Sequence, residues 1–353
     1  MYPVLSTIFS FYGGYNYCNR QVCREFRCMI KTKPDAYLYY LDDLCRDGLI
    51  NRFPRFTSSE KIAKLALDKG LYYLLVSYKK HIPSNVVDVA TRQGNLKILK
   101  WVEKNEYEIG DDCFRWAVKK GHYHILDWLS ELEYEGPEDL FYIAAEEGNV
   151  QMLDYLDKEG YYKEDEESIC EVAAKKGHIC VLEWYLEKDW SWSSHLCSLA
   201  AKGGQIETLK WLRGKGFPWN EETCVEAVKE ENLELLQWLN KEACPWNEEV
   251  CSSAVEKGYF KILNWARENG CPWNEEVCEI LAYKGNLEML QQVVDEGCPL
   301  TENVFTAAAQ GGYVEVLEWL KRVGCPLDRE DFFRAARNKK STAFWERRNL
   351  TPY

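Results

Sequence analysis

Residues 274–300 read Asn-Glu-Glu-Val-Cys-Glu-Ile-Leu-Ala-Tyr-Lys-Gly-Asn-Leu-Glu-Met-Leu-Gln-Gln-Val-Val-Asp-Glu-Gly-Cys-Pro-Leu, and this unit decides the fold because the chain repeats it. Each copy has an anchor, which is glycine in nine copies and glutamate in one, with a leucine five residues later. The anchors are Gly70, Gly94, Gly121, Gly148, Gly177, Gly204, Glu231, Gly258, Gly285 and Gly312. Seven of the nine intervals have the same length as the interval from Gly258 to Gly285, so the sequence predicts an array of ten similar units.

Within one unit, the pattern predicts a helix, a turn and a second helix. Asn274 is placed as an N-cap, and the acidic pair after it favours the positive end of the helix dipole. The anchor glycine suits the left-handed residue that ends a helix, and Pro272 precedes the next N-cap. Each side chain of the N-cap column is expected to accept a hydrogen bond from a first-turn amide. That column consists of Ser193, Asn220, Asn247, Asn274, Thr301 and Asp328.

The two helices of a unit are expected to bury different side chains. The first carries small residues at spacing i, i+3, i+4, as in Cys251, Ala254 and Val255, whereas the second carries bulky residues such as Leu263 and Trp265. Neither helix can bury its face alone, so each unit must be stabilised by its neighbours. We therefore expect an all-α repeat solenoid of about ten helix-turn-helix units with capping ends.

Composition and charge argue against two classes of partner, nucleic acid and membrane. The chain has 353 residues and a net charge of −13, which argues against binding driven by the phosphates of nucleic acid, and we expect no nucleic-acid partner. No apolar run is long enough to span a membrane, and Met1–Gly14 does not resemble a secretory signal, so we expect no membrane partner and an intracellular location. Residues 57–336 contain 31 basic and 51 acidic side chains, while both ends of the chain are basic.

The units resemble the ankyrin repeat in a short form with the phrase Gly-Cys-Pro-Trp-Asn, seen at residues 270–274. Similar arrays occur in large DNA viruses of amoebae, and the resemblance covers residues 57–338. It departs from the family in its shorter period, since the usual ankyrin period is about 33 residues. The resemblance implies an ankyrin-type fold, a role in protein–protein interaction, a monomer, and a location in the host cytoplasm.

Residues 1–56 do not fit the repeat. Two short apolar helices are expected there and a third around Tyr37–Leu44. The segment resembles a degenerate F-box, the module that docks onto the Skp1 adaptor of cullin-RING ubiquitin ligases. The adaptor-binding side chains would then be Leu5, Ile8, Val22, Cys23 and Phe26. The other interpretation is an N-terminal helical cap over the first repeat, and the two are compatible. Residues 339–353 form a basic C-terminal tail.

No sequence pattern indicates catalysis, and we expect neither an enzyme nor a cofactor. Cysteines form a first-helix column (Cys170, Cys197, Cys224, Cys251, Cys278) and a loop column (Cys244, Cys271, Cys298, Cys325). Members of one column lie one repeat apart, too far for a disulfide, and no Cys-x-x-Cys pair occurs, so buried thiols are expected and no metal site. His122 and His178 follow anchors and are expected to be structural.

The acidic pairs provide the candidate binding site. Because they recur at the same place in successive repeats, they form a ridge along one edge of the array, which would steer a basic partner. The candidate residues are Glu221, Glu222, Glu248, Glu249, Glu275 and Glu276. We therefore expect a non-catalytic scaffold that binds a protein partner on an acidic repeat surface, and the F-box resemblance implies a substrate receptor for a host ubiquitin ligase. The alternative is a structural spacer or capping protein without a ligase link.

Overall fold

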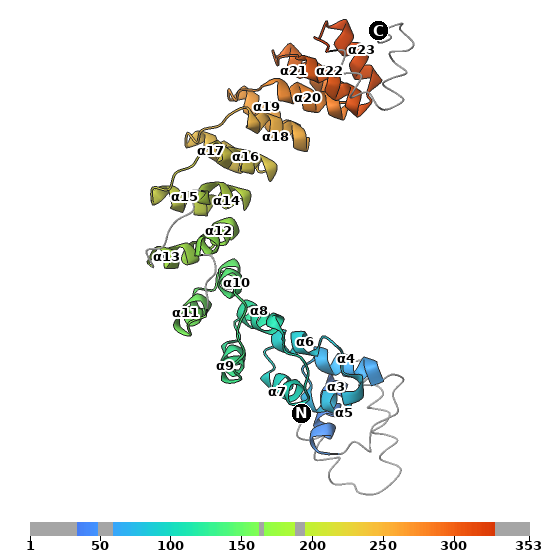
Figure 1. Cartoon of the computed structure of the whole chain (residues 1–353), viewed down its shortest axis with the longest axis vertical. Coiled ribbons are helices and arrows are strands. Elements are labelled where there is room, and N and C mark those ends of the chain that lie inside the picture. Colours follow the sequence, from blue (N-terminus) through green and yellow to red (C-terminus); the bar gives the residue numbers. More distant parts are fainter. Residues whose placement is uncertain (1–33, 49–58, 162–165, 188–194, 329–353) are drawn as a thin grey trace. The chain divides into compact units, whose positions relative to one another are not determined.

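The computed structural model describes residues 34–48, 59–161, 166–187 and 195–328. In these residues the secondary structure is helical, with no strand, and each of the ten anchors lies between the two helices of a pair (Figure 1). The all-α repeat fold predicted from the recurring anchors is confirmed. A further helix, α3 (Pro34–Arg46), precedes the pairs, and a short 3-10 turn, η2 (Lys79–His81), follows the first pair.

Each pair consists of a first helix before the anchor and a second helix after it. The first helices are α4 (Ser59–Asp68), α6 (Val86–Arg92), α8 (Asp111–Lys120), α10 (Leu140–Glu146), α12 (Glu166–Lys176), α14 (Leu196–Lys202), α16 (Glu221–Lys229), α18 (Glu249–Lys257), α20 (Glu275–Lys284) and α22 (Glu302–Gly311). The second helices are α5 (Tyr72–Ser77), α7 (Leu96–Lys104), α9 (Tyr123–Glu131), α11 (Val150–Lys158), α13 (Ile179–Glu187), α15 (Ile206–Gly214), α17 (Leu233–Lys241), α19 (Phe260–Glu268), α21 (Leu287–Asp295) and α23 (Val314–Arg322).

The anchors end the first helices in the left-handed conformation. All nine anchor glycines have positive φ, and Glu231 also has φ of 56°. At Gly258 the next amide, from Tyr259, donates to the Ala254 carbonyl at 2.8 Å, while the Gly258 amide donates to Val255. These two hydrogen bonds satisfy carbonyls that a helix end otherwise leaves free. The anchor column therefore fixes the turn between the two helices of each repeat.

The core follows the predicted division between small and bulky side chains. The leucine five residues after the anchor is buried in every repeat, at 0 or 1% exposure. Alanines of the first helices, such as Ala200 and Ala254, are fully buried as well. Small side chains allow neighbouring first helices to pack closely, and the leucines fill the space beneath them. Every repeat thus builds its core from the same two columns.

The chain divides into two compact units. The first comprises Met1–Ala144 and Asp154–Lys163, and the second comprises Ala145–Leu153 and Glu164–Tyr353. In the first unit, α4, α6 and α8 pack one against the next, and each of them packs on its own second helix. In the second unit the first helices α12, α14, α16, α18, α20 and α22 form a continuous row (Figure 1).

Helix α3 packs on α5 at the start of the array. It buries Leu38, Leu41 and Leu44, and the Asp42 carboxylate accepts a hydrogen bond from the Leu74 amide at 2.7 Å. An acidic side chain at a helix N-terminus satisfies a free amide and favours the helix dipole. Burial raises the pKa of Asp42, while the bond from Leu74 opposes that rise. The helix expected around Tyr37–Leu44 is therefore present and covers the first repeat.

No helix in the described ranges combines the length and apolar character that a membrane span requires.

Candidate functional site

The candidate site is the exposed face of the first helices α14, α16, α18, α20 and α22, which we term the first-helix face. Its N-terminal edge contains the six glutamates predicted from the sequence, in the first turns of α16 and α20 and at the start of α18. All six are exposed, namely Glu221, Glu222, Glu248, Glu249, Glu275 and Glu276. Three consecutive repeats thus present acidic pairs along one edge.

The N-cap side chains before these turns do not behave as predicted. Asn220, Asn274 and Thr301 have the extended backbone of an N-cap, yet their side chains accept no capping hydrogen bond. The Asn247 side chain of this column does accept from a first-turn amide, that of Glu249 at 3.2 Å. The physical reason is the side-chain rotamer, because an N-cap residue caps only when its oxygen reaches the first-turn amides, and the buried Oδ1 of Asn274 accepts no hydrogen bond at all.

Side-chain caps occur instead on the second helices, whose N-termini lie in the turn beside the previous repeat. Asn95, Asn149, Asn232 and Asn286 each accept a hydrogen bond from the amide three residues later, at 2.9–3.2 Å. Each of them directly follows an anchor. Capping therefore belongs to the partly buried turn rather than to the exposed edge.

The opposite edge of the first-helix face is basic. A lysine occupies the last turn of each first helix from α12 to α20, in the set Lys175, Lys176, Lys202, Lys229, Lys257 and Lys284. Acidic first turns and basic last turns both favour the helix dipole. The face is therefore bipolar, although the array as a whole is acidic.

Charged side chains also join neighbouring first helices. His195 Nδ1 lies 3.4 Å from Glu222 Oε2, which links the start of α14 to α16. Lys202 Nζ lies 3.7 Å from Glu226 Oε2, and Lys229 Nζ lies 2.7 Å from Glu226 Oε1. The bond to Glu226 raises the pKa of Lys229, and the fields of Glu226, Glu222 and Glu249 add to that rise. The charges of α14, α16 and α18 thus form one network.

Glu226 and two tyrosines are functional candidates that the sequence interpretation missed. Glu226 is buried, with 7% exposure, whereas Tyr283 and Tyr313 are 53% and 43% exposed. Tyr313 lies over Gly285 and Gly311, since a Cβ on either glycine would collide with its ring. A signal existed for Glu226: the matching positions of neighbouring repeats hold Leu199, Ser253 and Ile280, none of them charged.

The cysteines in the described ranges are free thiols, and those of the two columns are buried. As predicted, none pairs within its own column, yet members of different columns meet. A first-helix thiol lies close enough to the loop thiol of its own repeat for the two to act on each other's pKa, in the pairs Cys224–Cys244, Cys251–Cys271 and Cys278–Cys298. Burial raises the pKa of Cys197 and of Cys325 to about 11. The constant sequence offset between the two columns is the signal that could have revealed these pairs.

The loop thiols also close each repeat. Cys271, Cys298 and Cys325 donate at 3.3 Å to the backbone carbonyls of Asn247, Asn274 and Thr301, which begin the same repeats. Cys244 makes the same contact with Asn220 at 3.6 Å. In the described part of the chain, no group of three or more histidine, cysteine or acidic side chains has an arrangement that could hold a metal ion. The thiols contribute structure at these positions.

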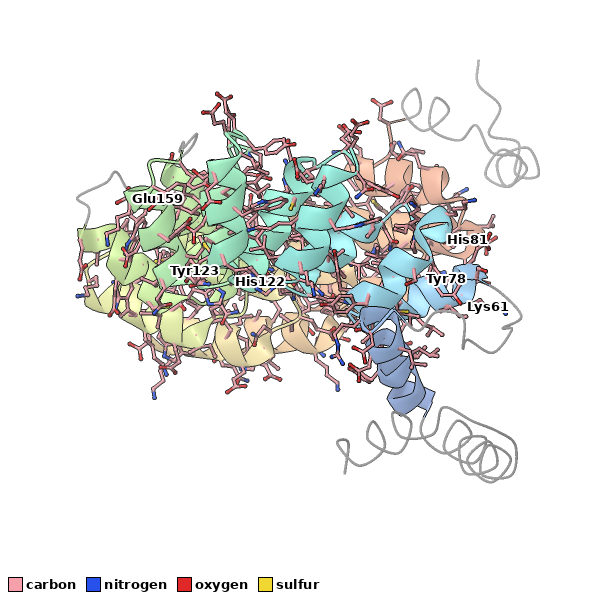
Figure 2. The ribbon with its side chains drawn as sticks, turned by 90° about the horizontal axis from the view of Figure 1, so that it is seen from below. Lys61, Tyr78, His81, His122, Tyr123 and Glu159 are labelled. Atoms are coloured by element: carbon pink, nitrogen blue, oxygen red, sulfur yellow. The ribbon has the colours of Figure 1, made fainter. Side chains whose placement is uncertain are left out.

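The histidines after anchors hold the turns together. The ring nitrogen Nε2 of His122 donates to the Arg92 carbonyl at 3.2 Å, and that of His178 donates to the Glu146 carbonyl at 2.9 Å. Figure 2 shows His122 beside Tyr123, whose ring lies 5.2 Å from that of Tyr155. These contacts join consecutive repeats, as expected for structural histidines.

The residues proposed to contact a Skp1-like adaptor, Leu5, Ile8, Val22, Cys23 and Phe26, lie outside the described residues, as does the basic tail 339–353.

Comparison with known proteins gives fold-level likeness only. No protein-family model matches the sequence, and no curated protein matches it. A crystal structure of the pentatricopeptide repeat protein PPR10 in complex with an 18-nt psaJ RNA element is 13% identical, with a TM-score of 0.41 over 94% of this chain. The human ASB11 ankyrin repeat domain is 15% identical, with a TM-score of 0.29 over 60% of this chain and 99% of that one. PPR10 from maize is 9% identical, with a TM-score of 0.28 over 90% of this chain and 55% of that one.

This chain spans 58% of the RNA-bound PPR10 structure that it matches. That structure overturns the exclusion of nucleic acid, because the neighbouring helical-repeat array is bound to RNA. The exclusion rested on total charge, and the row of lysines on the first-helix face illustrates why the total is a poor guide to each edge. The helical repeat scaffold is compatible with binding either protein or RNA.

Proposed function

We propose that this chain is a non-catalytic scaffold of ankyrin type that binds a protein partner on its first-helix face. The observation that carries the proposal is the exposed row of paired glutamates on three consecutive first helices. A partner with a basic segment would be steered to this row, and contacts made there would fix its register along the repeats.

Exposed tyrosines at the C-terminal ends of the first helices α20 and α22 add a second kind of contact. Tyr283 on α20 and Tyr313 before α23 provide amphipathic surface, which is typical of binding interfaces. Charged residues at an interface rim mainly govern the association rate, whereas buried aromatic contacts govern the residence time. The face therefore offers both the steering and the anchoring that a protein interface needs.

The test is affinity capture from the native cell with the full chain and a six-fold Glu→Gln variant of the candidate row. We expect protein capture by the variant to fall at least ~10-fold, since the row dominates steering. A matched control removes six exposed glutamates from the second helices and their ends instead: Glu207, Glu234, Glu242, Glu268, Glu288 and Glu315. Equal loss in the control, or capture of RNA without protein, would contradict the proposal.

A finer proposal concerns residues 1–56. We propose that they act as an F-box-like module, which would make the chain a substrate receptor for a ubiquitin ligase in a host cytoplasm, as the resemblance to viral arrays implies. The full chain should then capture a Skp1-like adaptor, and Leu5→Ala combined with Phe26→Ala should abolish that capture. If the full chain and the double variant capture the adaptor equally, or if neither captures it, residues 1–56 act as a cap, and the spacer interpretation gains support.

A further inference from the structure

Glu226 is the one charged side chain that is buried among the described residues. Burying a carboxylate away from water is costly unless it is paired and hydrogen-bonded, so its position needs an explanation. The fold itself does not require a charge there, because the equivalent residues of the adjacent first helices are Leu199 and Ser253. The charge is specific to one repeat.

The two oxygens of this carboxylate are used unequally. Oε1 accepts a hydrogen bond from Lys229 Nζ at 2.7 Å. Oε2 is buried and accepts no hydrogen bond, since Lys202 Nζ is 3.7 Å away. An ammonium group at that distance contributes attraction but no hydrogen bond. One oxygen of a buried carboxylate therefore retains its acceptor capacity.

The surroundings of Glu226 favour one more cation. Glu222 lies one turn earlier on α16, and Glu249 stands at the start of α18. Both are exposed, and both act electrostatically on Lys229. Three carboxylates thus face two ammonium groups, with His195 in contact with Glu222. The cluster thus combines an excess of negative charge on its exposed carboxylates with an acceptor oxygen of Glu226 that makes no hydrogen bond.

A second feature of the same face lies two repeats further along. Tyr283 occupies on α20 the position that Lys229 occupies on α16, and it is exposed together with Tyr313. Packed helices lie roughly 8 to 10 Å apart, so Tyr283, two helices along the row, is about 20 Å from Glu226. An extended peptide covers that distance with about six residues.

We propose that Glu226 receives an arginine side chain from an extended segment of the bound partner, and that Tyr283 and Tyr313 receive an apolar side chain about six residues away. This inference rests on the proposed protein-binding function. Because Oε2 is buried beside Lys202, the arginine must displace that ammonium group. A guanidinium group in its place can donate to Glu226 Oε2 and to the Glu222 carboxylate at once, which a single ammonium group does less well. Arginine and aromatic residues are also the side chains that contribute most at interface centres.

The test uses three short peptides, acetyl-X-Gly-Ser-Gly-Ser-Gly-Tyr-amide, in which X is arginine, lysine or citrulline. Binding to the full chain is followed through the methyl resonances of Leu199 and Ile280, which hold the position of Glu226 on α14 and α20. We expect the arginine peptide to bind at least ~10-fold more tightly than the citrulline peptide, because citrulline keeps the shape and loses the charge. Equal binding of the two peptides, or no binding of either, would overturn the inference.

Variants separate recognition from folding. Glu226→Gln should remove the preference for arginine, and the matched substitution Glu234→Gln on α17 should leave it unchanged. Lys202→Gln removes the competing ammonium group and should tighten arginine binding, which loss of a merely structural ion pair would not do. A preserved preference in Glu226→Gln would overturn the inference. If Glu226→Gln still captures the partner while the six-fold variant does not, this inference fails and the proposed function stands.

Discussion

The two units of the chain fill the loop after the second helix in different ways. Thirteen residues after the anchor, the first unit holds tyrosine at three positions and Pro83 at the other. The second unit holds Trp190 and Phe217 in its first two such positions and cysteine in its last four repeats. The residues compared are Tyr107, Tyr134 and Tyr161 in the first unit, and Cys244, Cys271, Cys298 and Cys325 in the second. The same fold therefore tolerates side chains of very different volume at one position.

The difference lies in where the side chain goes. The Cys271 thiol is fully buried and closes its repeat by donating to the Asn247 carbonyl. Tyr134 is exposed, and the Tyr107 ring lies 6.1 Å from that of Trp101. A thiol is small enough to be buried between the loop and the start of its repeat. An aromatic ring is too large for that space and lies on the surface of the loop.

Repeats of the first unit are joined to each other through their turns. Gln93 donates to the Leu67 carbonyl at 2.9 Å, Asn95 donates to the Gly70 carbonyl at 3.1 Å, and His122 reaches Arg92. Each bond connects one repeat to the turn of the previous one. The buried columns therefore define the repeat. The loop and turn contacts add stability, and they differ from one repeat to another.

The largest expected effect tests the part that both units share. Leu99→Ala in the first unit and Leu263→Ala in the second should each destabilise their repeats by about 2–5 kcal/mol, because both side chains are buried and leave a cavity. Urea unfolding, with hydrogen exchange read at α7 and α19, measures the loss. A cost below about 1 kcal/mol in one unit would show that its repeats depend on the reinforcements instead.

The next effect tests the difference between the loops. Cys271→Tyr should cost about 1–3 kcal/mol, because a ring cannot occupy the closed site without displacing its neighbours. The reciprocal change, Tyr107→Cys, should cost less than about 1 kcal/mol, since that ring is only partly covered. Both are measured by urea unfolding. Equal costs would mean that the two loops are built alike.

Features that depend on a repeated column could be predicted from the sequence. Ten copies of one pattern average out local exceptions, which is why the leucine column and the left-handed anchors, Glu231 included, are found where the pattern requires them. For Glu226 the same column gives only half of the answer. The uncharged residues at its position in the neighbouring repeats indicate a buried site, but they do not indicate that a carboxylate is held there by Lys229 and Lys202.

The loops show a second limit of prediction from the sequence. The column spacing correctly excluded disulfides within a column, but it contained no information on the path of the chain from Cys224 to Cys244. The N-cap side chains were predicted from residue type alone, which does not determine whether the side-chain oxygen reaches the first-turn amides. Predictions from the local sequence therefore succeed where the surroundings repeat. They fail where the path of the chain or the rotamer of one side chain determines the contact.

A smaller effect concerns pH. An exposed thiol ionises near 9.0, whereas burial raises the pKa of Cys197 and Cys325 to about 11. A raised pKa in the folded state means that ionisation favours unfolding, so stability is retained below pH 9 and lost as pH rises towards 11, by on the order of 1 kcal/mol per thiol. Thermal unfolding between pH 8 and 11 measures this, and Cys197→Ala with Cys325→Ala should flatten the profile. An unchanged slope would refute the assignment.

The smallest effect comes from two left-handed positions without glycine. Glu231 and Ala243 have φ of 56° and 57°, and the matching positions of the next repeat are Gly258 and Gly270. A side chain in this region costs about 1–2 kcal/mol, but glycine also increases the entropy of the unfolded chain. Glu231→Gly and Ala243→Gly should therefore stabilise the protein by only about 0.5 kcal/mol each, whereas Gly258→Ala should destabilise it by about 1 kcal/mol. Urea midpoints that fall for the glycine variants, or rise for Gly258→Ala, would mean that these turns relax when the side chain changes. The left-handed conformation of the column would then be a consequence of packing rather than its cause.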